Sequence, residues 1–332
     1  MALELDKMTR IPGDEAFRRD SIKGTQWEAT YAGALSFMRR KYTRDLTGVD
    51  IAVTGIPFDQ SVSHRPGTRF GPEGIRKASA ESAWGPFWPW MFDPFETLAV
   101  IDYGDCFFDW GRKENFPATL EKHATDIISS GAEMISLGGD HYVSYPLLKA
   151  HHKKHGPLAL VHFDAHRDVE VDDGGRIDHG TMFCYAVREG LIDPRKSIQL
   201  GIRTTFVGET TMGFRIIYAD EVHGSTAEQL AAIIKKQVGA SKAYLTFDID
   251  CLDPSVAPGT GTPIPGGLTY HQAASVIRKL TDINFIGMDM VEVSPPYDHA
   301  EITSGAASGL IMEYLCLKAW QKGARAAPMP ER

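Results

Sequence analysis

The chain has 332 residues, of which 43% are hydrophobic, 23% charged and 10% aromatic. These proportions are typical of a globular protein and exclude a disordered or collagen-like chain. The 35 basic and 43 acidic residues give a net charge of −8, which argues against a general nucleic-acid or anionic-membrane binder.

The four cysteines are scattered, which indicates reduced thiols and a cytoplasmic protein rather than a zinc or redox motif. Residues 1–7 do not have the basic and then apolar pattern of a signal peptide. No stretch approaches the roughly 20 apolar residues of a membrane span. We therefore expect no membrane association.

Residues 1–48 lack a clean hydrophobic period and are interpreted as an N-terminal arm, followed by a single catalytic domain over 49–325. In that domain short runs of Val, Ile, Leu and Phe alternate with longer amphipathic stretches. The short runs are typical of buried parallel strands. The predicted strands are 51–56, 98–102, 134–137, 158–163, 197–202, 214–218, 244–249 and 285–291.

The amphipathic stretches between the strands predict helices. They cover 72–82, 117–130, 143–155, 226–238, 270–280 and 305–318. Alternation of strand and helix implies right-handed crossovers and a parallel sheet covered on both faces. We predict a three-layer αβα sandwich with a mostly parallel eight-stranded sheet; strand count alone leaves a closed (β/α)₈ barrel as the alternative.

Three predicted strands end in residues that bind metals. Gly-Gly-Asp-His occupies 138–141, Asp-Ala-His-Arg-Asp occupies 164–168, and Asp-Ile-Asp occupies 248–250. On an extended chain alternate side chains point the same way, so Asp164, His166 and Asp168 would converge. Taken singly, each aspartate could cap a helix and each histidine could be an ordinary residue. Together, buried carboxylates in such number favour a bound cation.

Charge balance suggests two cations. Four aspartates (164, 168, 248 and 250) carry four negative charges, which two divalent ions neutralise, while His141 and His166 add neutral nitrogens. Six ligands are few for two ions, so bridging carboxylates are expected. An oxygen-rich set without sulfur favours two Mn²⁺ per subunit, although Ni²⁺, Co²⁺ and Fe²⁺ are also compatible.

These motifs, in this order, resemble the ureohydrolase family of arginases, agmatinases and related guanidino hydrolases, and are most similar to agmatinases. The resemblance extends over about residues 50–320. Further matching segments are 65–72, 178–183, 201–204, 257–268 and 287–293.

The resemblance implies the αβα arginase-like fold, a homotrimer or homohexamer, and roles for individual residues. One manganese would be held by His141, Asp164, Asp168 and Asp248, and the other by Asp164, His166, Asp248 and Asp250. Glu292 would bind the substrate guanidinium, His179 would protonate the leaving amine, and Asp168 would orient the attacking hydroxide. From the residues alone, a salt bridge to a nearby arginine is the lesser alternative for Glu292, and the spacing of His179 favours a surface histidine.

The resemblance implies hydrolysis of a small cationic guanidino compound, agmatine, to putrescine and urea, in polyamine metabolism. A guanidino acid (4-guanidinobutyrate or 3-guanidinopropionate) or free guanidine is the alternative substrate. Arg167 departs from the family pattern and by alternation points away from the metals; it forms a salt bridge or, at the pocket, selects a carboxylate-bearing guanidine. The acidic residues 170–173 favour a cationic tail if they border the entrance, and otherwise form a solvated turn.

The segment 84–92 is dense in aromatic residues. It could pack in the core or at a subunit interface, or it could line the channel that grips the substrate chain. Neither use changes the expected reaction.

Overall fold

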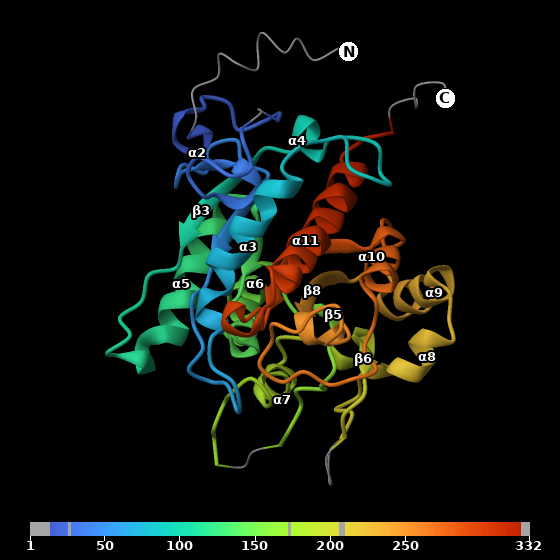
Figure 1. The fold of residues 1–332 in the computed structure, drawn as a ribbon. Coiled ribbons are helices and arrows are strands. Elements are labelled where there is room, and N and C mark those ends of the chain that lie inside the picture. The colour runs from blue at the N-terminus through green and yellow to red at the C-terminus, as the bar shows by residue number, and fades with distance from the viewer. Residues whose placement is uncertain (1–13, 26–27, 172–173, 206–209, 327–332) are drawn as a thin grey trace.

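The computed structural model describes residues 14–25, 28–171, 174–205 and 210–326. Its centre is an open sheet in which every pair of neighbouring strands is parallel, in the order β1-β3-β2-β4-β9-β8-β5-β6-β7 (Figure 1). The strands are β1 (Lys41–Tyr42), β2 (Ile51–Gly55), β3 (Val100–Asp105), β4 (Glu133–Leu137), β5 (Ala159–Phe163), β6 (Ile198–Ile202), β7 (Arg215–Tyr218), β8 (Lys242–Asp248) and β9 (Asn284–Val291).

Helices cover both faces of the sheet. They are α2 (Glu15–Arg18), α3 (Gly71–Ser79), α4 (Pro94–Thr97), α5 (Phe116–Ser129), α6 (Ser144–His155), α7 (Met182–Arg188), α8 (Ala219–His223), α9 (Ala227–Val238), α10 (Tyr270–Arg278) and α11 (Ile302–Gln321). Helix α11 packs against α3, α4 and α10 on one face, whereas α5 and α6 pack together on the other (Figure 1). The three-layer prediction is therefore confirmed.

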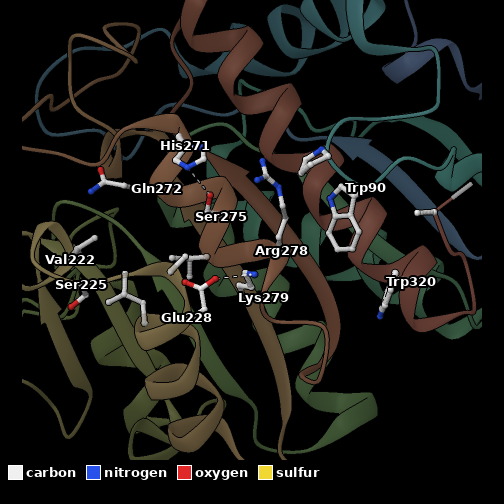
Figure 2. A pocket seen from close by; sticks show the side chains of 15 residues that line it. Trp90, Val222, Ser225, Glu228, His271, Gln272, Ser275, Arg278, Lys279 and Trp320 are labelled. Carbon is white, nitrogen blue, oxygen red and sulfur yellow. Dashed lines mark hydrogen bonds and ion pairs between the residues drawn. The ribbon is translucent and has the colours of Figure 1, made fainter. Parts of the chain in front are cut away.

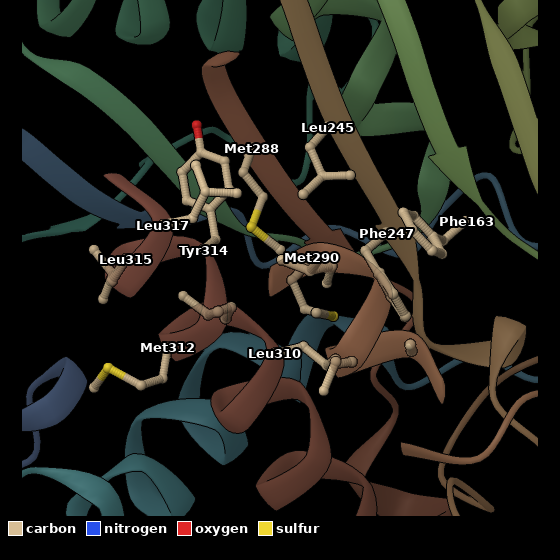
Figure 3. Packing of buried hydrophobic residues seen from close by; sticks show 14 of the residues in the cluster. Phe163, Leu245, Phe247, Met288, Met290, Leu310, Met312, Tyr314, Leu315 and Leu317 are labelled. Carbon is tan, nitrogen blue, oxygen red and sulfur yellow. The ribbon is translucent and has the colours of Figure 1, made fainter. Parts of the chain in front are cut away.

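The two helical layers divide the side chains of each strand between them. In β8, Leu245 and Phe247 join the core on the α11 side, whereas Tyr244 joins the core on the α5–α6 side. Met288 and Met290 of β9 lie beside them and face α11 (Figure 3). This period of two explains why strands buried on both faces are continuous apolar runs.

Local signals in the sequence set several helix ends. Thr226 and Thr269 each accept a hydrogen bond from the backbone of a glutamine three residues later, and each glutamine side chain accepts one from the threonine backbone. These reciprocal bonds satisfy amide groups that a helix start leaves unpaired. Pro72 and Pro117 occupy first-turn positions of α3 and α5, where a missing N–H costs nothing.

All eight predicted strands are present, but the predicted strand number was one too low. The ninth strand is β1, only two residues long, and it pairs with β3 from within the segment interpreted as an N-terminal arm. A strand this short has no measurable alternation, which is why the sequence did not reveal it. Within the described part of the chain, β1 and β7 lie at opposite ends of the strand order and do not pair with each other, so the alternative of a closed barrel is wrong. Among the described residues no helix is long and apolar enough to cross a membrane.

Candidate metal centre and guanidinium site

The predicted site residues gather at the carboxyl ends of β4, β9, β8 and β5, which are consecutive neighbours in the middle of the sheet. His141 follows β4, Glu292 follows β9, Asp248 ends β8, and Asp164 follows β5. Carboxyl ends of parallel strands are where α/β sheets bind ligands. The topology alone therefore brings together residues as far apart in the sequence as His141 and Glu292.

Gly139 lets the loop after β4 turn tightly enough to position His141. A Cβ atom on Gly139 would lie 1.7 Å from the carbonyl oxygen of Phe58, so no larger residue fits without a shift of the backbone. The same carbonyl accepts a hydrogen bond from the backbone of Asp140 at 2.8 Å, and the carbonyl of Gly139 accepts one from Glu292 at 2.9 Å. Gly139 and Asp140 thus tie the loop to the residue after β9 and to the chain after β2.

His141 lies in the first of two groups of potential metal ligands. Its Nδ1 is 2.9 Å from Oδ2 of Asp168, 3.1 Å from Oδ2 of Asp164 and 3.3 Å from Oδ2 of Asp248. None of these contacts has hydrogen-bond geometry, and the buried Nδ1 is left without a partner among the described residues. An imidazole nitrogen facing three carboxylate oxygens fits the donor set of a divalent cation.

The other ring nitrogen fixes the orientation of His141. Nε2 lies 2.8 Å from the hydroxyl of Thr246 on β8, and that hydroxyl also contacts the buried carboxylate of Asp289 on β9. Asp289 accepts further hydrogen bonds from Ser144 (2.7 Å) and Tyr244 (3.0 Å). The Thr246 hydroxyl at Nε2 selects the tautomer of His141 that leaves Nδ1 available for a metal.

The second group of potential ligands contains Asp164, His166 and Asp250. Nδ1 of His166 is 3.0 Å from Oδ2 of Asp250 and 3.4 Å from Oδ1 of Asp164. Asp164 therefore directs one oxygen to each group, which suits a bridging carboxylate. Asp248 contributes Oδ2 beside His141, while its Oδ1 accepts a hydrogen bond from the backbone of Asp250 at 2.8 Å.

The crowded carboxylates repel one another in the absence of a cation. Burial and the negative charge of Asp164 raise the pKa of Asp168 to about 6. Burial, together with Asp250 and Asp164, raises the pKa of Asp248 well above its usual value. Bound cations would relieve both effects, because an opposite charge favours the ionised carboxylate.

Strand alternation predicts the convergence of Asp164, His166 and Asp168, but the structure achieves it differently. The chain leaves β5 at Phe163, and Asp168 has a left-handed backbone conformation with φ of 55°. Asp250 lies in a 3-10 turn rather than on an extended strand. The side chains still meet, because turns at the strand ends redirect them.

One residue of this region was given no role by the sequence reasoning. His162, inside β5, lies with Nε2 2.7 Å from Oδ2 of Asp164. The amide of Gln199 donates to Nδ1 of His162 (3.0 Å) and to the carbonyl of Arg167 (2.6 Å). Nδ1 is thus the acceptor, so Nε2–H donates to Asp164 and holds the carboxylate in place. The signal available in the sequence was a histidine inside the predicted strand 158–163, two residues before Asp164.

Glu292 projects a carboxylate beside the cluster. It follows β9 in a left-handed conformation with φ of 62° and is 1% exposed. Its Oε1 accepts a hydrogen bond from the backbone of His141 at 2.8 Å and lies 3.0 Å from Nδ1 of His179. Its Oε2 is buried and has no hydrogen-bond partner among the described residues. An unpaired buried carboxylate oxygen suits a cationic ligand.

His179 lies at the mouth of the site, in the loop before α7. Nε2 is 2.9 Å from the backbone nitrogen and 2.8 Å from the hydroxyl of Ser63. The neutral ring accepts the Ser63 N–H, and the protonated ring can donate to the hydroxyl instead. Burial alone would lower the pKa of His179, but the hydrogen bond and charge of Glu292 raise it to about 9.

A cavity of about 140 Å³ opens over the cluster. Its lining consists of Ser63, His166, Arg167, Asp168, Glu170, His179, Gly180, Asp248 and Thr262. The alternation argument turned Arg167 away from the metals, yet Arg167 belongs to the cavity wall. Its Nη2 donates to the hydroxyl of Tyr218 at 2.8 Å. Residues 172 and 173 of the acidic loop lie outside the described residues.

Another cavity, of about 610 Å³, contains none of the predicted site residues. It lies between α9, α10 and the end of α11, and its lining includes Trp90, Arg278 and Trp320 (Figure 2). Trp90 donates to Glu313 at 2.6 Å, and Arg278 also bonds that carboxylate. The aromatic segment 84–92 thus lies away from the cavity over the cluster, and the structure does not support a role in gripping the substrate.

Comparison with known proteins agrees with this architecture. A sequence model of the Arginase family matches residues 49–316. An agmatinase of Chromobacterium violaceum is 55% identical over 309 residues, which cover 92% of this chain and 95% of that protein. The crystal structure of a hypothetical agmatinase from Burkholderia thailandensis superposes with a TM-score of 0.92 at 50% identity. The match covers 94% of this chain and 99% of the Burkholderia chain.

A further solved structure, proclavaminate amidino hydrolase from Streptomyces clavuligerus, has a TM-score of 0.81 and 35% identity over 89% of this chain and 100% of its own. The fold and the paired donor groups define a three-layer α/β protein with two adjoining groups of potential metal ligands at the carboxyl ends of its central strands. The chain belongs to the Arginase family.

Proposed function

We propose that this protein hydrolyses agmatine to putrescine and urea. The observation that carries the proposal is the buried Oε2 of Glu292, which has no hydrogen-bond partner among the described residues and lies next to two groups of potential His and Asp metal ligands. A guanidinium is planar and positively charged, so it matches a carboxylate oxygen that lacks a donor. Relatives named agmatinase, at 46–55% identity over most of the chain, support this substrate.

The metal site is proposed to hold two Mn²⁺ ions, with His141, Asp164, Asp168 and Asp248 at one and Asp164, His166, Asp248 and Asp250 at the other. The donors are oxygen and imidazole nitrogen without sulfur, a set that suits Mn²⁺ and also admits Ni²⁺ or Co²⁺. When bound, such a pair lowers the pKa of a shared water and so supplies a nucleophile near neutral pH.

The side chains around the metals would do the remaining work. Glu292 would hold the guanidinium through Oε2, and Asp168 would orient the attacking water. His179 would carry a proton at Nε2 and deliver it to the departing amine, because Ser63 can stabilise both the protonated and the neutral ring. Net, water adds to the guanidinium carbon, the bond to the alkyl nitrogen breaks, and urea and an amine leave.

A second candidate substrate is a guanidino acid such as 4-guanidinobutyrate. The observation in its favour is Arg167, whose cation borders the cavity. The test is urea release by the Mn²⁺-loaded protein with agmatine and 4-guanidinobutyrate compared at equal concentration. The proposal expects faster release from agmatine; faster release from the acid would replace agmatine with the guanidino acid.

The domain organisation and assembly are also part of the proposal. Residues 1–48 would form an arm on a single catalytic domain over 49–325; the family match at 49–316 supports these limits, and residues 1–13 lie outside the described residues. We propose a cytoplasmic homotrimer or homohexamer that acts in polyamine metabolism. Size-exclusion chromatography with light scattering tests the assembly.

A further inference from the structure

Four fully buried polar side chains form a row across the middle of the sheet. They pair in register on neighbouring strands: Gln199 of β6 with His162 of β5, His162 with Thr246 of β8, and Thr246 with Asp289 of β9. The row faces α5 and α6, the side to which Tyr244 of β8 also points. Buried polar groups in such a place need hydrogen-bond partners, so their contacts show what the row holds.

The row lies just before the proposed metal ligands along β5 and β8. Asp164 follows His162 by two residues, and Asp248 follows Thr246 by two. Both carboxylate oxygens of Asp164 are engaged: Oδ2 lies 2.7 Å from Nε2 of His162, and Oδ1 accepts the backbone N–H of His166 at 2.6 Å. Contacts at both oxygens fix the plane of a carboxylate that is proposed to bridge two ions.

Gln199 sets the state of His162 from the β6 end of the row. Its Nε2 lies 2.6 Å from the backbone carbonyl of Arg167 and 3.0 Å from Nδ1 of His162. A carbonyl oxygen can only accept, so the amide nitrogen must face Arg167, and its second hydrogen is then directed to Nδ1. His162 therefore carries its own hydrogen on Nε2, the atom that faces Asp164.

The second hydrogen bond of Gln199 acts on Asp168. The carbonyl of Arg167 belongs to the peptide group that leads into Asp168, whose φ of 55° is unusual for a residue other than glycine. Restraining the plane of this peptide group restrains φ of Asp168, and with it the carboxylate whose Oδ2 lies 2.9 Å from Nδ1 of His141. One amide nitrogen thus acts at both ends of the segment 164–168.

We propose that Gln199 is a positioning residue of the metal centre, which orients Asp164 through His162 and Asp168 through the Arg167 carbonyl. This inference rests on the proposed metal pair and adds a residue that contacts neither carboxylate. Partners that orient a metal ligand in this way change metal affinity about 10- to 100-fold. The effect of Gln199 should therefore appear in the binding of Mn²⁺ itself, before any substrate is added.

The experiment measures Mn²⁺ affinity by competition with a fluorescent chelator. Gln199→Met keeps the length of the side chain but removes its donors, and it should weaken Mn²⁺ binding about tenfold or more. Gln199→Asn is a milder second variant, because the shorter amide cannot reach both acceptors, and it should be weakened in the same direction. Gln321→Met is the matched control: Gln321 ends α11, and its Nε2 also donates to two backbone carbonyls, at 2.9 and 2.8 Å.

A double variant separates positioning from a general loss of packing. His162→Phe keeps a ring but removes both nitrogens, so Gln199→Met should cost several-fold less in that background than in wild type. Equal costs in the two backgrounds, or a folded Gln199 variant that binds Mn²⁺ as tightly as Gln321→Met, would overturn the inference. If wild type itself retains no Mn²⁺, the proposed metal pair fails instead.

Discussion

Nδ1 of His179 lies 3.0 Å from Oε1 of Glu292, although one residue precedes α7 and the other follows β9. The contact joins the group proposed to carry a proton to the group proposed to hold the guanidinium. Because Oε1 is occupied by His179 and by the backbone of His141, only Oε2 is left for a ligand. This division of one carboxylate between structure and binding underlies the first two predictions.

Glu292→Gln should weaken substrate binding without loss of metal. The amide keeps an oxygen for the backbone of His141 but loses the charge that matches a guanidinium. Losing a charged hydrogen bond of this kind costs about 1.5–3 kcal/mol, which is roughly a 10- to 100-fold rise in KM for agmatine. Steady-state kinetics with metal analysis by mass spectrometry checks this; full activity in the variant would remove Glu292 from the site.

The His179–Glu292 contact predicts a pH-dependent stability in the metal-free protein. The pKa of His179 rises from 6.5 to about 9 on folding, so the charged imidazole stabilises the fold fully below pH 6.5. This contribution is lost as the pH rises through 9. With about 1.4 kcal/mol per pKa unit, wild type should exceed His179→Asn by on the order of 3 kcal/mol at pH 6 and converge with it by pH 10.

Denaturant unfolding at several pH values measures this difference. His123→Asn is the control, since burial lowers the pKa of His123 to about 4 and its contribution should stay flat between pH 7 and pH 10. A wild-type advantage over His179→Asn that stays constant or grows toward pH 10 would contradict the assigned ion pair.

Thr246→Val should weaken metal binding although Thr246 is not a proposed ligand. The substitution removes the hydroxyl at Nε2 of His141 and keeps the shape of the side chain. Loss of such an orienting partner costs about 10- to 100-fold in metal affinity. Competition with a fluorescent chelator measures the affinity. Thr54→Val, a buried strand substitution away from the cluster, is the control, and equal affinities in the two variants would refute the role of Thr246.

Arg167→Thr tests whether the cation in the cavity wall opposes a cationic substrate. Removing the charge should raise the ratio of kcat/KM for agmatine over 4-guanidinobutyrate several-fold, because like charges repel across a small cavity. Arg215→Thr, on the exposed side of β7, is the control. If the ratio is the same in both variants, Arg167 serves only to hold Tyr218 and the loop after β5.

The sequence predicted the strands and helices that are long enough to show a hydrophobic period. Strands such as β5 and β9 are mostly apolar, with His162 and Asp289 as the polar exceptions inside them, so their positions were correct within a few residues. The two-residue β1 and the seven-residue α7 are too short to show a period and were not predicted. Their stability comes from tertiary contacts, which single-sequence patterns do not contain.

The candidate site was predictable for a different reason. Residue types that bind metals ended three predicted strands, and parallel topology brought them together. The sequence did not reveal the orientation of the Asp168 side chain, because that orientation depends on the left-handed backbone conformation of Asp168. It also did not reveal that His162 holds Asp164, because that contact depends on the path of the loop after β5 in three dimensions.

Metal content and urea release, measured on the same samples, test the central claim most directly. The wild-type protein loaded with Mn²⁺ should hold two ions per chain and release urea from agmatine. Asp248→Ala should lose metal and activity together, whereas Asp282→Ala, an exposed partner of Lys235, should retain both. An Asp248→Ala protein that keeps two ions and full urea release would show that the cluster at the centre of the sheet is not the catalytic metal site.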